Sequence, residues 1–498
     1  MTTVLPDSLL AQVRSSRDSI VINGQRRAAA SGETFDVFDP GTGEVVGQAA
    51  AGGAADVDAA VRDAERAFQA GWRDANPNLR ARALLRLADL INEHTEELAL
   101  LESLDNGKPL WETTNFDVPM TAEVYRYYGG WATKLAGEVL PVSPMFGPAF
   151  AYTRREPYGV VGAIVPWNFP LMISAWKLAP ALATGNSVVI KPAEQTPLTA
   201  GRIAELALEA GFPPGVMNVV TGFGESAGAP LVAHPLVRTV AFTGSGEVGR
   251  LIMRAAAEQM KPVHLELGGK SPNVVLADAD IPAAVQGSMM GIFFNQGEVC
   301  CAGSRIYVDA PVYDEFVEAM TTHAGSLKLG HALAEGTQMG PLVSSEHLER
   351  VGGFVDRSRS DGATVAVGGE AAKDVDGGGY FYRPTVVTDT TDDMEIAREE
   401  VFGPVAVVMR FEGEEDAVRR ANGNAAGLAA AVWTRDVSRA HRLAAQLEAG
   451  TVWVNTYNMI DPVMPFGGFK ASGFGRDCGA EALNHYTQTK SVWVSLDR

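Results

Sequence analysis

After Tyr152 the chain alternates short β-branched runs with stretches of helical periodicity, and this alternation restricts the fold more than any other feature. Such a pattern is typical of a parallel sheet with crossover helices, in which each loop after a strand lies at the edge where open α/β sheets bind ligands. The first predicted strands are GVVGAIV, SVVIKP, VMNVV, VRTVAFT and PVHLELGG. The predicted helices between them cover residues 171–184, 198–210, 226–233 and 247–260.

A second α/β run extends from residue 272 to about 454, with NVVLAD, SRIYVD, YFYRPTVV, VAVVMRF and AAAVWT as predicted strands. Upstream, residues 56–108 repeat apolar positions three and four apart, which predicts two amphipathic helices separated by Asn76, Pro77 and Asn78. The segments GEVLPV, AFAYTRREP and KSVWVSL predict isolated strands whose edges could pair between subunits. We therefore expect an α/β fold with two doubly wound parallel-sheet domains and additional strands that could join subunits.

Length, charge and cysteine content narrow the class of protein. The 498 residues, 46% of them apolar, suffice for about three domains at roughly 150 residues each. A net charge of -19 opposes nucleic acid and anionic membranes. The start, MTTVLPDSLLAQVRSSRDS, lacks the basic and apolar regions of a secretion signal, and no apolar run approaches the ~20 residues of a membrane span. Three cysteines cannot form a disulfide framework, so we expect a cytoplasmic protein without nucleic-acid or membrane partners.

Two of the three cysteines, Cys300 and Cys301, are adjacent in FFNQGEVCCAGSR. Gly297 and Gly303 bracket the pair, which suits a thiol held close to a ligand by unusual backbone geometry. A buried structural cysteine is the alternative, although the surrounding residues are polar. No CxxC or HExxH motif occurs, so no metal site is expected. Spacing does not exclude a papain-like Cys and His pair, but the predicted parallel sheet argues against one.

Two loops could each hold a dinucleotide. VRTVAFTGSGEVG contains a formal GxGxxG pattern, and Glu266 follows Gly246 by 20 residues, as a ribose-binding acid would. The loop SVVIKPAEQTP offers a second ribose site through Lys191 and Glu194, although a solvated ion pair has the same pattern. A third loop, VPWNFP, presents Asn168 between prolines and aromatics, either as a rigid amide donor or as a turn residue.

Together the motifs PWNFP, IKPAEQTP, FTGSGEVG, LELGGKSP, FFNQGEVCCAGSR, EEVFGPV and PFGGFKASGFGR resemble, in order and spacing, the motif set of the aldehyde dehydrogenase superfamily. The resemblance covers nearly the whole chain and implies NAD(P)-dependent oxidation of a small-molecule aldehyde to a carboxylate. It also implies a Rossmann-like dinucleotide-binding domain at residues 1–134 and 157–265 and a catalytic domain at 266–483. A small oligomerisation hairpin would be formed by strands at 135–156 and 484–498, in a homo-oligomer.

The same resemblance implies a catalytic set. Cys300 matches the nucleophile, so Cys301 would be only its neighbour. Asn168 matches the amide that stabilises the oxyanion together with the cysteine N–H, and Glu266 matches the general base, not a ribose ligand. Lys177 and Asp477 match residues that relay protons to the base. A thiolate is the strongest nucleophile available near neutral pH, which explains the residue type.

The resemblance further implies NAD as the cofactor, with NADP possible. Lys191 and Glu194 match the adenosine ribose contacts, Ser245 the pyrophosphate contact, and Glu400 with Phe402 the nicotinamide ribose and ring. The other implied cofactor contacts are Val165, Pro166, Trp167, Gly224, Phe242, Gly244 and Leu267. The implied substrate tunnel is apolar and aromatic, which favours an aliphatic or aromatic aldehyde, and consists of Phe169, Ile173, Trp176, Phe294, Val299, Ile460 and Phe466.

Three positions depart from the family pattern. Glu298 stands where Gln is more frequent and would raise the pKa of the thiol if its carboxylate pointed inward. Gly246 replaces a Thr or Pro and makes the phosphate loop more mobile. Asp477 is shorter than the Glu that is frequent at this position.

Two alternative functions use the same fold. A CoA-acylating dehydrogenase would not need Glu266 as a base, and a catalytically silent structural relative would not need Cys300, Asn168 and Glu266 together.

Overall fold

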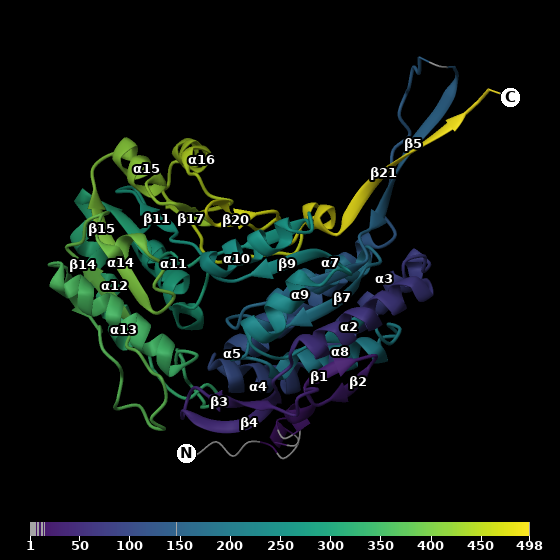
Figure 1. Ribbon diagram of the computed structural model, residues 1–498. Helices are drawn as coiled ribbons and strands as arrows, with labels where there is room; N and C mark the ends of the chain where they lie inside the picture. Colours follow the sequence, from purple (N-terminus) through teal and green to yellow (C-terminus); the bar gives the residue numbers. More distant parts are fainter. Residues whose placement is uncertain (1–5, 7–8, 11–12, 14, 146, 498) are drawn as a thin grey trace.

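The structure is a computed structural model that describes residues 6, 9–10, 13, 15–145 and 147–497. Part of the N-terminal stretch in which no secretion signal is expected lies outside the described residues, as do a few positions of the expected segments 1–134, 135–156 and 484–498. The chain forms two α/β bodies and one long hairpin that projects away from both (Figure 1). Among the described residues, no helix is long and apolar enough to cross a membrane.

The first body is built on an eight-stranded sheet in the order β2-β1-β8-β7-β6-β9-β10-β20. Its central strands are parallel and confirm the five predicted runs: β6 (Val160–Ile164), β7 (Ser187–Lys191), β8 (Met217–Val219), β9 (Val237–Thr243) and β10 (Val263–Glu266). The sheet is not purely parallel, because antiparallel strands close both edges: β1 (Ile20–Ile22), β2 (Gln25–Arg27) and β20 (Gly473–Phe474). The strand β20 comes from the far C-terminal part of the chain.

Helices cover both faces of this sheet, as in a doubly wound fold. The helix α7 (Pro170–Ala183) is buried along its whole length, which agrees with its nearly continuous apolar sequence. The others are α8 (Leu198–Glu209), α9 (Ala229–Ala233) and α10 (Gly246–Ala257). The stretch predicted as a helix from residue 226 begins as a short π-helix, η4 (Gly224–Gly228), and α10 ends three residues earlier than expected.

Upstream of the sheet, the prediction of two helices over residues 56–108 was wrong in number. The helix α2 (Ala54–Ala67) continues into a short π-helix, η2 (Phe68–Trp72). The helix α3 (Pro77–Glu93) begins as expected after Asn76, whose side chain accepts a hydrogen bond from the Asn78 N–H. His94 leaves helical geometry and separates α3 from α4 (Thr95–Asn106). Upstream of β5, no prediction covered β1 and β2 or the remaining elements, which are η1 (Ser15–Asp18), β3 (Thr34–Asp39), β4 (Glu44–Ala50), α5 (Leu110–Glu112), η3 (Thr113–Asp117) and α6 (Val118–Trp131).

The second body contains a seven-stranded sheet in the order β13-β14-β15-β12-β11-β17-β18. All neighbours are parallel except β13 and β14. Its strands are β11 (Pro272–Val275), β12 (Arg305–Asp309), β13 (Thr364–Val367), β14 (Thr385–Thr388), β15 (Val405–Phe411), β17 (Ala429–Trp433) and β18 (Thr451–Val454). Its helices are α11 (Ile281–Phe293), α12 (Tyr313–Ser326), α13 (Ser345–Ser360), α14 (Glu395–Arg398), α15 (Glu414–Asn422) and α16 (Val437–Gln446). The YFYRPTVV run becomes a strand only from Thr385, after Pro384.

The projecting hairpin pairs β5 (Ala149–Pro157) with β21 (Thr487–Ser495) over nine antiparallel positions. Figure 1 shows both strands extending beyond the two bodies, and exposed apolar side chains on them include Phe150, Trp493 and Val494. Two of the three isolated strands predicted at the sequence level are therefore confirmed. The GEVLPV segment is not a strand and makes a single bridge, from Val139 to Tyr152. Minor elements are η5 (Phe294–Gly297), η6 (Ala310–Val312), β16 (Ala426–Gly427), β19 (Phe469–Lys470) and η7 (Glu481–His485).

Candidate active site

The loop that carries the two adjacent cysteines follows α11 and precedes β12. Its backbone is unusual, since Asn295 and Gln296 take positive φ angles of 46° and 53°. Gly297 also has a positive φ, and a Cβ at this position would lie 2.2 Å from the Gly403 carbonyl oxygen. Cys300 is half-buried and Cys301 is buried. The glycine and the strained asparagine and glutamine thus hold the Cys300 thiol at an accessible position.

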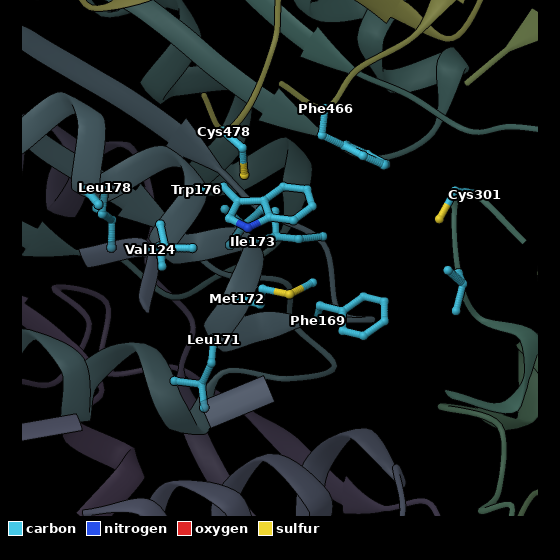
Figure 2. Packing of buried hydrophobic residues seen from close by; sticks show 14 of the residues in the cluster. Val124, Phe169, Leu171, Met172, Ile173, Trp176, Leu178, Cys301, Phe466 and Cys478 are labelled. Atoms are coloured by element: carbon cyan, nitrogen blue, oxygen red, sulfur yellow. The ribbon is translucent and has the colours of Figure 1, made fainter. Parts of the chain in front are cut away.

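Cys300 lies at the wall of an apolar cavity between the two bodies. All seven residues predicted for the substrate tunnel line this cavity together with the thiol, and Phe116, Met172, Cys301 and Asn458 complete it. Figure 2 shows Phe169, Met172 and Trp176, at the start of α7 and within it, extending into the space that Phe466 and Cys301 border from other segments. The lining therefore suits an apolar group that ends at the Cys300 sulfur.

The surroundings of Cys300 favour the neutral thiol over the thiolate. A hydrogen bond with Cys301 is the first cause that raises its pKa above the ordinary value, and burial is the second. Glu298 does not act as the inward anion that the sequence left open. Its carboxyl is fully buried, its Oε1 accepts a hydrogen bond from the Val343 N–H at 3.0 Å, and it lies 3.7 Å from His347 Nε2. Burial raises the pKa of Glu298 well above its usual range, which favours the neutral acid.

Asn168 lies in the turn between β6 and α7 and is 2% exposed. Its Nδ2 donates to the Glu298 carbonyl oxygen at 2.8 Å, and its own backbone oxygen accepts from Asn295 Nδ2 at 2.8 Å. These two bonds tie the VPWNFP turn directly to the cysteine loop. The amide has two N–H groups, so one remains for a reacting oxygen next to the cysteine.

Glu266 ends β10 and is 3% exposed. Burial, and after it the nearby Asp477 carboxyl, raise the pKa of Glu266 well above its usual range. Lys177 Nζ, from α7, lies 2.6 Å from Asp477 Oδ2. The structure thus brings together Glu266, Lys177 and Asp477, which come from three distant parts of the sequence.

His264 also belongs to this group, although no motif indicated it, and its Nε2 lies 3.3 Å from Glu266 Oε1. A signal for it existed, because residues two apart on a strand face the same side of the sheet. His264 and Glu266 occupy such positions on β10. Burial lowers the pKa of His264 well below its usual range, so the ring is neutral near pH 7.

The residues predicted to bind the adenosine end lie at the carboxyl ends of β7 and β9. Lys191 is the last residue of β7, and its Nζ lies 3.1 Å from Glu194 Oε2. Ser245 caps α10, with its Oγ accepting a hydrogen bond from the Val248 N–H. A Cβ at Gly224 would have open space around it, so an anionic group can approach that backbone closely. These features fit a dinucleotide, because Lys191 and Glu194 can hydrogen-bond to ribose hydroxyls and the N-terminus of α10 can bind a phosphate.

The residues predicted for the nicotinamide end also lie close together. Phe402, with a φ of 60°, packs against the Trp167 ring at a centroid distance of 5.2 Å. Glu400 Oε1 accepts a hydrogen bond from the Gly269 N–H at 3.0 Å, and burial of the carboxyl raises the pKa of Glu400 to about 7. Val165 lies beside the end of β7, because its N–H donates to the Lys191 carbonyl oxygen.

The remaining predicted cofactor residues differ in accessibility. Phe242 and Leu267 are 4% and 8% exposed and belong to the apolar core under the sheet. Gly244 lies against the Phe242 ring, where a Cβ would come within 2.5 Å of a ring carbon. Pro166 is half-buried beside Trp167.

Among the described residues, no cluster of three or more His, Cys, Asp or Glu side chains could hold a metal ion.

Comparisons with known proteins agree with this arrangement. The sequence profile of the "Aldehyde dehydrogenase family" matches residues 27–492. The mitochondrial aldehyde dehydrogenase of Rattus norvegicus is 49% identical over 482 residues, covering 96% of this chain and 92% of the rat protein. Phenylacetaldehyde dehydrogenase of Pseudomonas fluorescens is 48% identical over 481 residues, covering 96% and 95%. The structure of the NAD+ complex of a Bacillus cereus aldehyde dehydrogenase superposes with a TM-score of 0.96 at 48% identity, covering 99% of each chain.

The profile match includes every residue that lines the cavity around Cys300. On this basis the chain belongs to the aldehyde dehydrogenase family.

Proposed function

We propose that this enzyme oxidises an apolar aliphatic or aromatic aldehyde to the carboxylic acid with NAD, using Cys300 as nucleophile. The observation that carries the proposal is the cavity in which aromatic side chains lead to the Cys300 thiol. Glu266 is close enough to contribute to the raised pKa of that thiol. A nucleophile, a buried base and an apolar binding surface are the parts that acyl transfer through a thioester needs.

In this scheme the Cys300 thiolate attacks the aldehyde carbon and forms a thiohemiacetal. The free N–H of Asn168 and the backbone N–H of Cys300 stabilise the oxyanion. NAD, when bound, supplies the hydride acceptor that converts the thiohemiacetal to a thioester. Glu266 then removes a proton from water, whose oxygen attacks the thioester carbon and releases the acid and the thiol.

Lys191 and Glu194 would bind the adenosine ribose, and Ser245 at the N-terminus of α10 would bind the pyrophosphate. Glu400 and Phe402 would hold the nicotinamide ribose and ring. The side chain of Glu194 is 35% exposed, so its carboxylate can accept hydrogen bonds from a ribose 2′-OH. A 2′-phosphate at the same place would be repelled, which supports NAD over NADP.

The names of two relatives support the substrate class. One is a phenylacetaldehyde dehydrogenase, and a structure 45% identical to this chain is an indole-3-acetaldehyde dehydrogenase. In both named aldehydes, one CH2 group separates the aromatic ring from the aldehyde carbon. The aromatic cavity at Cys300 suits the same chemistry.

We further propose a homo-oligomer joined through the β5 and β21 hairpin, and the division into cofactor, catalytic and oligomerisation segments given above. Three free cysteines support a reducing, cytoplasmic location. The test of the whole proposal is NADH formation, followed at 340 nm, with a panel of apolar and charged aldehydes, and identification of the product. Formation of the free acid from apolar aldehydes without added CoA is expected. A product that requires CoA, or no NADH with any aldehyde, would contradict the proposal.

A further inference from the structure

The side chain of His264 lies between two buried carboxyl groups. Its Nε2 is 3.3 Å from Glu266 Oε1, and its Nδ1 is 3.7 Å from Asp477 Oδ1. None of the three side chains is more than 4% exposed. A neutral imidazole has one N–H and one free lone pair, so it can accept a proton on one nitrogen while it releases a proton from the other.

Within the described part of the chain, Glu266 Oε2, His264 Nδ1 and Asp477 Oδ1 are buried and have no hydrogen-bond partner. Such atoms are costly to leave unpaired, which points to interactions that form at another stage of the reaction. The 3.7 Å gap between His264 and Asp477 needs a movement of under about 1 Å to reach a hydrogen-bonding distance of about 3 Å.

The surroundings hold the His264 ring in this orientation. The His485 ring stacks on it at a centroid distance of 4.5 Å and an interplanar angle of 12°. His485 Nε2 accepts a hydrogen bond from the Arg476 N–H, which fixes the second ring. Gly475 makes room for both, because a Cβ there would lie 2.3 Å from His264 Cδ2. Stacking leaves the two in-plane nitrogens of His264 facing the two carboxyls.

Asp477 is suited to take up a proton and to give it back. Burial is the first cause that raises its pKa, and the Lys177 ammonium opposes this. The charged and titratable groups around His264 are thus Glu266 on its own strand, Lys177 on α7, Arg476 and Asp477 in the loop after β20, and His485 on η7.

We propose that His264 carries the proton between Glu266 and Asp477, so that His264 and Asp477 form a proton store behind Glu266. This rests on the proposed function, in which Glu266 is the base for thioester hydrolysis. Glu266 takes a proton from the attacking water and passes it to His264 Nε2, while the proton on His264 Nδ1 moves to Asp477 Oδ1. Glu266 is again a carboxylate, His264 has changed tautomer, and Asp477 carries the proton. When the acid leaves and water refills the cavity, both shifts reverse and Glu266 releases the proton to solvent.

His264 acts through Glu266 in this scheme and is a positioning residue, so its test needs a readout that simple packing would not move. We choose His264→Phe, which keeps the stacked ring without nitrogens, and Asp477→Asn, which keeps the size of the acceptor. His485→Phe is the matched control, because it changes the neighbouring ring of the same stack. The measurements are the NADH burst in rapid mixing, the intact mass of the enzyme during turnover, and kcat as a function of pH.

For His264→Phe and Asp477→Asn we expect a burst of one NADH per site, an acyl adduct on Cys300 that accumulates, and kcat lower by about tenfold with an altered pH profile. The double variant should be no slower than the slower single variant, because both changes remove the same store. His485→Phe should retain kcat within about twofold.

Normal kcat and no acyl adduct in His264→Phe would overturn the proposal. Full recovery of kcat in His264→Asn, whose amide can hydrogen-bond to Glu266 but cannot take up and release a proton, would also overturn it. Equal losses of kcat in His485→Phe and His264→Phe would also overturn the proposal, because the effect would then come from the packing of the two rings. Failure of the proposed function would be distinct, because the wild-type enzyme would then form no NADH with aldehydes or no adduct at Cys300.

Discussion

Lys177 Nζ lies 2.6 Å from Asp477 Oδ2, and both side chains are fully buried. Removing one partner of such a pair leaves an uncompensated charge, whereas replacing both can be nearly neutral. We expect Lys177→Met to lower the free energy of unfolding by about 3–5 kcal/mol in denaturant titrations. Lys177→Met combined with Asp477→Leu should recover most of this loss. A single variant as stable as the wild type would show that water reaches the pair.

Substitutions at the two adjacent cysteines should have opposite outcomes. Cys300→Ala is expected to abolish aldehyde oxidation, whereas Cys301→Ala should retain most of it. Because the contact with Cys301 is the first cause that raises the Cys300 pKa, Cys301→Ala should move the midpoint of Cys300 alkylation to lower pH. Iodoacetamide modification followed by mass spectrometry between pH 6 and 10 measures that midpoint, taking ~8.5 as the free-thiol reference. Loss of activity in Cys301→Ala alone would reverse the assignment.

The core elements of the fold could be predicted because their sequences are distinctive. The strand β9 matches its predicted bounds, since four of its seven residues are β-branched. The edge strand β2 has the sequence QRR and no apolar residue, so local pattern could not reveal it. It forms because β1 offers an unpaired edge. The break at His94 could not be predicted either, because apolar periodicity continues through it from α3 into α4.

The candidate site was predictable where its residues belong to short motifs. Asn168 and Cys300 are in loops whose sequences already suggested chemistry, and the structure ties these loops together through the Glu298 carbonyl. Contacts between distant segments left no such signal. Lys108 illustrates this: its ammonium lies over the Phe169 ring at 3.9 Å and forms an ion pair with Asp117, with both charged side chains fully buried. Only the folded chain brings these residues together behind the tunnel.

Cofactor choice should depend on Glu194. The wild-type enzyme is expected to have a higher kcat/KM for NAD than for NADP, because the carboxylate would repel a 2′-phosphate. Glu194→Gln keeps the size of the side chain and removes the charge, so the preference should fall by roughly tenfold, mainly through a lower KM for NADP. Steady-state kinetics with both cofactors measures the change. Equal use of the two cofactors by the wild-type enzyme would contradict the role given to Glu194.

Oligomerisation should depend on the projecting hairpin. Trp493, on β21, and Leu496, just after it, are 59% and 57% exposed, which is unusual for large apolar side chains. Deleting residues 491–498 removes the partners of residues 149–153 and should yield monomers or aggregates in light scattering. Trp493→Lys with Leu496→Lys is the milder variant, because it keeps the backbone pairing of β21 and changes only two exposed apolar side chains. An unchanged oligomer in both variants would show that other surfaces hold the subunits together.

The most direct test of the mechanism concerns Glu266, because substituting a general base and substituting a ribose ligand have different effects on the kinetics. If Glu266 is the base, Glu266→Gln should still allow thiolate attack and one hydride transfer, which gives a burst of NADH and an acyl-enzyme on Cys300. Steady turnover should fall by ~10²-fold or more.

If Glu266 bound the adenosine ribose, the main change would be a raised KM for NAD, with kcat recovered at saturation. The structure favours the first outcome, because the Glu266 carboxyl is buried beside His264 and its field reaches the Cys300 thiol, while Lys191 and Glu194 lie together at the end of β7. Wild-type kcat at high NAD in Glu266→Gln would assign Glu266 to the cofactor, and the proton store proposed for His264 and Asp477 would then have no base to serve.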